Sequence, residues 1–398
     1  MQKGLKLKWL LIVSLINAFG MGFLWPLVSI YIHDELHQNM TMVGVILLIN
    51  SLGQVVGSLI SGHLFDKWRP ITIIRIGIIA LIGIMTLLVF FHGWPSFPIL
   101  LAIDGLMVGW MTAIINAFGT AVIGHDGRKV FNLLYFTANF GMVFATALVG
   151  AVYGFGVTWL FIIALAMYVI IFFIINRHFD VEVNVDEAEE EEEIDKPNNF
   201  KLPIANKMII SAILIGLVGI WIAYAQWNGN VSVYFNSILK LPLWQYSMLW
   251  TINGGLVVVF QLVMNAFHLI GNKRVMWIQI FAGLTLFIGA YYLLSLSRVF
   301  PMFVIAMIVT TLGEVMVFPM LPALVNDLTP AHSKGHYQGL VTAAPSLGRA
   351  VGPLFGGYMV DQLGYMPMFN TTTVIVAISA VIIVGMIIVY RKRIVKFD

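Results

Sequence analysis

The chain has 398 residues and a formal net charge of +3, and 60% of its residues are hydrophobic whereas only 10% are Asp, Glu, Lys or Arg. A soluble domain has about 45 to 50% apolar and about 25% charged residues, so the composition excludes an ordinary soluble protein and indicates a membrane protein. Cysteine is absent, which excludes disulfides, thiolate catalysis and thiolate-bound metals.

Apolar segments long enough to cross a membrane recur along the whole chain. A bilayer core of about 30 Å needs about 20 apolar residues per helix. The first segment is too long for the hydrophobic part of a cleavable signal peptide, so we expect it to remain as a helix. The sequence predicts an all-α membrane protein with twelve transmembrane helices, at residues 8–33, 42–64, 71–91, 97–122, 130–152, 157–176, 207–228, 243–267, 276–295, 300–325, 336–360 and 367–390.

Basic residues are distributed asymmetrically between the loops. If the N-terminus lies in the cytoplasm, only Lys240 and Arg298 fall on the outer side, and the other lysines and arginines outside the spans are cytoplasmic. This pattern follows the positive-inside rule, which predicts that both termini are cytoplasmic and that the number of spans is even. The short loops are typical of a bacterial cell-membrane protein.

The loop between the second and third spans, GHLFDKWRP at residues 62–70, carries charges of both signs. A carboxylate just beyond a helix end, followed by cations, can bridge to a neighbouring helix and hold the cytoplasmic side closed. We therefore predict a gating loop formed by Gly62, Asp66, Lys67 and Arg69. The alternative is that the cations only obey the positive-inside rule.

Asp104 lies within the fourth predicted span, in LLAIDGLMVGW, near its outer side. Because ionisable groups inside a membrane are costly, they normally have a partner or a function. Asp104 could be a second proton or cation site, or an acid that packs between helices through a bond to a neighbouring hydroxyl group.

An acidic segment, DVEVNVDEAEEEEEIDKPNN, separates the first six predicted spans from the last six. Such a self-repelling run is typical of a linker. We predict a six-helix bundle at 1–176, a cytoplasmic linker at 177–206 and a second six-helix bundle at 207–398. Calcium binding by the run Glu189 to Glu193 is the alternative function for the linker.

The two halves share a pattern of small residues. The fifth span contains GMVFATALVG at 141–150 and the eleventh contains GRAVGPLFGG at 348–357. Small residues at this spacing let two helix backbones approach closely within a membrane. Repeated halves of six spans predict two bundles related by an axis along the membrane normal, which is a transporter design.

Glu314 and Arg349 are the charged residues expected deepest in the membrane. They lie at similar distances from the turn near Ala331, so two antiparallel helices would bring them to similar depth. A buried ion pair is one interpretation. The other is a proton site, since a carboxyl group in a poorly solvated cavity can hold a proton and release it when its access to water changes.

Three segments resemble a known family. The loop at 62–70 resembles the signature loop of the major facilitator superfamily, although its second glycine is missing, and 348–357 resembles an element best known from antiporters of that superfamily. TLGE, which ends at Glu314, resembles the tenth span of some drug/proton antiporters, where the Glu is implicated in coupling. The resemblance implies the major facilitator fold and assigns proton coupling to Glu314 alone. Asp104 and Arg349 are further candidates because they are charged residues within predicted spans.

In transporters of this shape the first, fourth, seventh and tenth spans line a central cavity, and the resemblance carries that expectation to this chain. The side chains available there are mainly aromatic and amide. Aromatic rings bind flat lipophilic molecules and cations, and amides orient polar groups. The candidate cavity residues are Asn17, Trp25, Trp110, Asn116, Trp221, Tyr224, Gln226, Trp227 and Phe318.

The sequence therefore predicts a proton-coupled secondary active transporter that exports small amphipathic or lipophilic compounds, of the multidrug efflux type, by rocker-switch alternating access. The alternatives are a proton-coupled transporter of a specific metabolite, such as a sugar or amino acid, or a flippase for a lipid-linked substrate. We expect no enzymatic activity, no cofactor besides the coupling proton, no metal and no nucleic-acid partner. The expected partners are a small-molecule substrate, protons and membrane lipids, and the expected state is a monomer.

Overall fold

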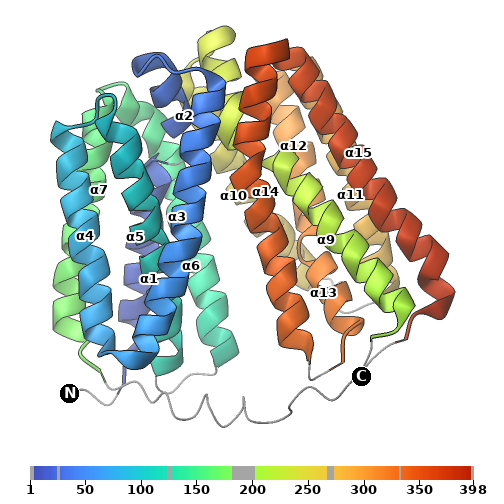
Figure 1. The fold of residues 1–398 in the computed structure, drawn as a ribbon, viewed down its shortest axis with the longest axis horizontal. Coiled ribbons are helices and arrows are strands. Elements are labelled where there is room, and N and C mark those ends of the chain that lie inside the picture. The colour runs from blue at the N-terminus through green and yellow to red at the C-terminus, as the bar shows by residue number, and fades with distance from the viewer. Residues whose placement is uncertain are drawn as a thin grey trace. The chain divides into compact units, whose positions relative to one another are not determined.

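The computed structural model describes residues 4–24, 27–122, 127–181, 202–266, 273–330 and 333–395. These residues are almost entirely helical, which confirms the all-α prediction (Figure 1). Within the described ranges, nine helical stretches are long and apolar enough to cross a membrane, and Leu7–Gly22 is a shorter apolar helix. The total of twelve crossings stays a prediction.

The helices of the first half of the chain cover the first six predicted spans, with α3 and α6 a few residues longer than expected. They are α1 Leu7–Leu24, α2 Val28–Ile30, the π-helical turn η1 Tyr31–Glu35, α3 Met40–Lys67, α4 Pro70–Phe90, α5 Ser96–Ala117, the 3₁₀ turn η2 Phe118–Ala121, α6 Gly127–Tyr153 and α7 Val157–His178.

The helices of the second half cover the last six predicted spans. They are α9 Ile204–Tyr224, the π-helical turns η3 Trp227–Val231 and η4 Tyr234–Ile238, α10 Leu243–Ala266, α11 Lys273–Leu296, α12 Phe300–Val317, α13 Met320–Asp327, α14 Lys334–Leu363, α15 Tyr365–Tyr390 and the 3₁₀ turn η6 Arg391–Arg393. The tenth predicted span is divided between α12 and α13.

The described residues group into two compact units. Unit 1 lies within Met1–Gln38, Val45–Glu192 and Pro242–Thr251, and unit 2 lies within Asn39–Gly44, Glu193–Leu241 and Ile252–Asp398. Helix α7 continues to His178 and α9 begins at Ile204, so helices occupy both ends of the predicted linker. The acidic run at Glu189 to Glu193 lies outside the described residues, and the predicted domain limits stay predictions.

The repeated small-residue segments pack in the way that their sequence predicts. In unit 1, a Cβ atom at Gly141 of α6 would lie 2.5 Å from the backbone oxygen of Leu15 in α1. In unit 2, a Cβ atom at Gly348 of α14 would lie 2.7 Å from the backbone oxygen of Val218 in α9. Glycine therefore allows the fifth predicted span to contact the backbone of the first in unit 1, and the eleventh to contact the backbone of the seventh in unit 2.

Pro and Gly mark helix ends where their backbone preferences require it. Pro70 opens α4, where its missing N–H donor has no helical partner to lose. Gly364 ends α14 with φ of 88°, a left-handed conformation that glycine adopts without steric cost, and α15 starts at the next residue. These two residues fix where the chain reverses direction.

Candidate functional site

Glu314 lies in the last turn of α12, next to the break in the tenth predicted span. The backbone N–H of Phe318 donates to the carbonyl oxygen of Glu314 at 3.0 Å, and α12 ends at Val317. Pro319 follows, and its missing N–H prevents the helix from continuing unbroken into α13. The sequence thus places the acid one turn before the interruption of the helix.

Neutral donors from two other helices hold the carboxyl group of Glu314. The hydroxyl group of Tyr224 in α9 donates to Glu314 Oε2 at 3.0 Å, and the amide Nδ2 of Asn253 in α10 donates to the same oxygen at 2.9 Å. Asn253 Nδ2 also lies 2.9 Å from Thr311 Oγ1, one turn before Glu314. Tyr224 and Asn253 are buried, and Glu314 itself is partly exposed.

This arrangement can accommodate both protonation states of Glu314. Hydrogen bonds to an ionised carboxylate are stronger than those between neutral groups, so the two donors favour the charged form. Their neutrality leaves that charge without a compensating cation, and entry of water or its exclusion then decides whether a proton is bound. A group with these properties can take up and release a proton.

The buried ion pair that the sequence left open is not formed. Glu314 and Arg349 both lie in the described part of the chain, and no ion pair joins them. Arg349 is exposed; its guanidinium carbon lies 4.7 Å from the centroid of the Trp221 ring, and its Nη2 donates to Ser346 Oγ at 3.4 Å. Glu314 instead accepts hydrogen bonds from Tyr224 and Asn253, and the Arg349 guanidinium lies over the Trp221 ring.

An aromatic cluster connects Arg349 with the Glu314 site. The rings of Trp221 and Phe318 stack with centroids 4.7 Å apart and an interplanar angle of 14°. The Tyr224 ring lies 4.9 Å from that of Trp221 and 5.9 Å from that of Phe318. Trp221 and Phe318 are partly exposed and Tyr224 is buried, so two of the predicted cavity residues present an aromatic surface beside the Glu314 site.

Gln226 and Trp227 have a different environment. Both are buried, and Gln226 Nε2 donates to the backbone oxygens of Ile222 and Gly352 at 2.8 Å each. Gln226 Oε1 also accepts from Asn230 Nδ2 at 2.6 Å. These bonds hold the end of α9 against α14, and the expected contact of Gln226 and Trp227 with substrate stays a prediction.

The candidate cavity residues of unit 1 lie in different environments. Asn17 is buried and its Nδ2 lies 3.6 Å from the sulfur of Met21; Trp110 is buried and its Nε1 donates to the backbone oxygen of Ile73 at 2.9 Å, which joins α5 to α4. Asn116 is exposed near the end of α5. Trp25 lies outside the described residues, and the expected contacts of Asn17, Trp110 and Asn116 with substrate stay predictions.

The residues of the predicted gating loop lie where α3 ends and α4 begins. Gly62 and Asp66 belong to α3, which ends at Lys67, and Arg69 precedes Pro70. Lys67 and Arg69 are exposed. The side chain of Asp66 lies outside what the structure describes, so its role as a latch stays a prediction.

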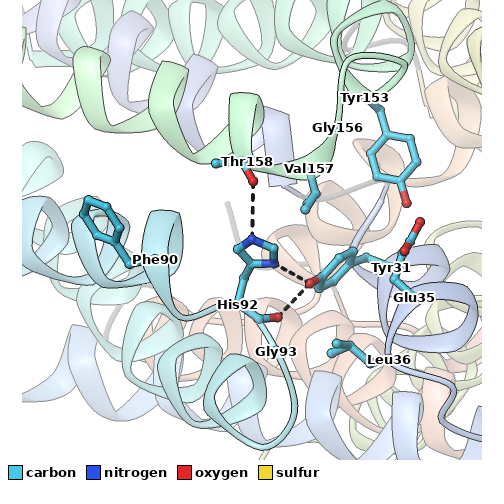
Figure 2. A pocket seen from close by; sticks show the side chains of 10 residues that line it. All are labelled: Tyr31, Glu35, Leu36, Phe90, His92, Gly93, Tyr153, Gly156, Val157 and Thr158. Carbon is cyan, nitrogen blue, oxygen red and sulfur yellow. Dashed lines mark hydrogen bonds between the residues drawn. The ribbon is translucent and has the colours of Figure 1, made fainter.

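Unit 1 also contains a cavity of about 510 Å³ that holds none of the predicted site residues (Figure 2). Figure 2 shows the His92 ring between Tyr31 and Thr158: Nδ1 lies 2.7 Å from Tyr31 Oη and Nε2 lies 3.3 Å from Thr158 Oγ1. The other lining side chains include Glu35 and Tyr153. His92 is thus fixed at both ring nitrogens, and the volume suits a small molecule.

Sequence reasoning missed Asn253, which completes the Glu314 site, and also Asn50, Gln54 and Tyr168 around Asp104. Each is a polar residue within an otherwise apolar span, and that could have marked it as a candidate. What the sequence could not supply is which of these polar residues meet across helices.

Comparisons with known proteins identify the family. The model of the Major Facilitator Superfamily matches residues 10–295 and 268–396. The uncharacterized MFS-type transporter YttB of Bacillus subtilis (strain 168) is 36% identical over 389 residues, which cover 98% of this chain and 96% of that protein. The quinolone resistance protein NorA of Staphylococcus aureus is 26% identical over 100 residues, 25% of each chain.

Solved transporter structures share the fold. A mutant of the peptide transporter POT has a TM-score of 0.79 at 11% identity, with 98% of this chain and 95% of that chain covered. The nucleoside transporter NupG has a TM-score of 0.75 at 14% identity, with 97% and 99% covered. With a family match that covers nearly the whole chain and a relative that matches it from end to end, this chain belongs to the Major Facilitator Superfamily and is a multi-pass membrane transporter, not an enzyme.

Proposed function

We propose that the protein is a proton-coupled secondary active transporter that exports small amphipathic or lipophilic compounds, and that Glu314 binds the coupling proton. The observation that carries the proposal is the Glu314 carboxyl group, held by the neutral donors Tyr224 and Asn253 beside an aromatic surface. The partial similarity to the quinolone resistance protein NorA supports the efflux direction.

The chemistry of the cluster favours substrates with a flat apolar part. A ring that inserts beside Trp221 and Phe318 gains stacking contacts with both. The Arg349 guanidinium at one end of the cluster and the Glu314 carboxyl group at the other can orient polar groups of the substrate. A densely hydroxylated sugar would find few hydrogen-bonding partners on this surface.

Coupling follows from the shared position of Tyr224. Its ring belongs to the aromatic cluster and its hydroxyl group donates to Glu314. A substrate that displaces this ring lengthens a bond that stabilises the ionised carboxylate, and protonation of Glu314 removes the acceptor charge that holds the ring. Substrate binding and protonation of Glu314 therefore both change the position of the Tyr224 side chain. This shared effect links export to proton entry during alternating access.

The remaining predictions belong to the same proposal. The transporter acts as a monomer in a bacterial cell membrane with both termini in the cytoplasm, and the loop around Asp66 closes its cytoplasmic side in a rocker-switch cycle. Arg349 sets the charge of the substrate site. Asp104 is a second site, for a proton or another cation.

Reconstitution into liposomes with an imposed pH gradient tests the proposal. We expect accumulation of aromatic amphipathic compounds by the wild type, and its loss in Glu314→Gln. Substrate exchange without a gradient should persist in Glu314→Gln, which shows that the variant is folded. Thr310→Ala is the matched control, since the Thr310 hydroxyl group is buried in the same helix and bonds to Ala306.

Two results would contradict the proposal. Gradient-driven transport by Glu314→Gln at the wild-type rate would exclude this residue from coupling. Accumulation of sugars, amino acids, peptides or nucleosides in place of amphipathic compounds would contradict the proposed substrate class.

A further inference from the structure

A second cavity lies in unit 1 around Asp104. Its volume is about 40 Å³, and helices α1, α3, α5 and α7 contribute to its wall. One water needs about 10 to 15 Å³ of such volume, so the cavity has room for one small ion or a few waters. Its lining residues are Met21, Val28, Leu47, Asn50, Gln54, Leu101, Asp104, Val108 and Tyr168.

Glycines bring the polar wall of this cavity together. A Cβ atom at Gly57 of α3 would overlap the backbone oxygen of Leu106 in α5, and a Cβ atom at Gly109 of α5 would overlap the backbone oxygen of Gln54 in α3. The two helices therefore touch backbone to backbone, as small residues allow in membranes. This contact places Gln54 next to the helix that carries Asp104.

Two polar atoms of this cavity are buried without a hydrogen bond to any residue that the structure describes. Asp104 is 5% exposed and Tyr168 is fully buried. Asp104 Oδ1 and Tyr168 Oη make no hydrogen bond within the described ranges. Buried polar atoms in proteins nearly always have a partner, and a persistent exception points to a bound water or ion.

The amide groups beside Asp104 are fixed by other bonds. Asn50 Nδ2 donates to the backbone oxygen of Leu101 at 2.7 Å, and Gln54 Nε2 donates to Asn50 Oδ1 at 2.9 Å. The lining thus combines one carboxylate, one phenol and two carboxamides, all of which carry oxygen atoms that can coordinate a hard cation. Among the nine lining residues, Asp104 is the only one with a formal charge.

We propose that this cavity is a binding site for a single dehydrated monovalent metal cation, with Na⁺ as the probe. A monovalent ion neutralises the single carboxylate, whereas a divalent ion would leave an uncompensated positive charge in a poorly polar interior. A cation can contact Asp104 Oδ1 and Tyr168 Oη together. A proton on Asp104 alone would leave the Tyr168 hydroxyl group without a partner.

This site is separate from the proposed coupling site at Glu314. Its residues belong to unit 1, whereas Glu314, Tyr224 and Asn253 belong to unit 2. The inference therefore goes beyond the proposed function, and a binding measurement tests it without any transport assay.

The test is equilibrium binding of radioactive Na⁺ to the purified full-length protein, with choline chloride holding the ionic strength constant. We expect saturable binding of one Na⁺ per chain, and its loss in Asp104→Asn. Tyr168→Phe should weaken affinity by about tenfold, the equivalent of one neutral oxygen contact. Ser61→Ala is the matched control, because Ser61 is a buried polar residue of α3 that contacts the backbone of α5 outside the cavity.

A second measurement keeps the test decisive if Asp104→Asn does not fold. Ligands that bind the native state raise thermal stability, and the chain contains 11 Trp whose fluorescence reports unfolding. Na⁺ should raise the melting temperature of the wild type and of Glu314→Gln equally. Absence of saturable Na⁺ binding, equal binding by Asp104→Asn, or stabilisation by acid but not by Na⁺ would overturn the proposal.

Discussion

Removing the hydroxyl group of Tyr224 should make the transporter bind its coupling proton more tightly. Tyr224→Phe keeps the ring in the aromatic cluster but deletes one of the two donors to Glu314 Oε2, leaving Asn253. A hydrogen bond to a charged group contributes about 1.5 to 3 kcal/mol. Because that bond stabilises the ionised form, its loss should shift the pH of half-maximal transport upward by about 1 to 2 units.

The assay is substrate efflux from liposomes, measured over a range of external pH at a fixed potential. Tyr358→Phe serves as the control, since Tyr358 is an exposed residue of α14 and the same atom is removed there. An unchanged pH profile in Tyr224→Phe, or an equal shift in Tyr358→Phe, would refute the assignment of the Glu314 carboxyl group as the titrating site.

Three further outcomes follow from the packing. Trp221→Ala removes the ring between Arg349 and Phe318, so KM for aromatic substrates should rise by about tenfold, the equivalent of one stacking contact. The apparent affinity for competing hydrophilic compounds should not change. Arg349→Lys keeps the positive charge but removes the guanidinium group that lies 4.7 Å from the Trp221 ring centroid, so transport of neutral aromatic compounds should fall whereas transport of anionic ones should not, with each class measured separately. Gly57→Ala overpacks the α3–α5 contact and should destabilise the protein by about 1 to 3 kcal/mol in thermal unfolding, whereas Gly83→Ala, with open space around it, should not.

Hydropathy predicted where the helices lie because a span must satisfy its backbone internally and expose apolar side chains to lipid. The division of the tenth predicted span could be expected from Pro319, because proline lacks the N–H that a continuous helix needs. Helix rise placed Glu314 and Arg349 at similar depth, but depth does not fix the direction of a side chain around its helix, and Arg349 stacks on Trp221 instead. The partners Tyr224 and Asn253 come from helices far apart in sequence, and a pattern along one chain does not specify such pairs.

The interruption between α12 and α13 has a mechanical consequence. Phe318 lies at this interruption, and Glu314 lies one turn before it. A displacement of the Phe318 ring can therefore reach the ionisable group through four residues of backbone. Cargo that wedges Phe318 away from Trp221 would also reorient Glu314 against its two donors. Substrate binding and proton exchange would then both depend on one small rotation of the backbone around Phe318. No conformational change elsewhere in the molecule would be needed to couple them.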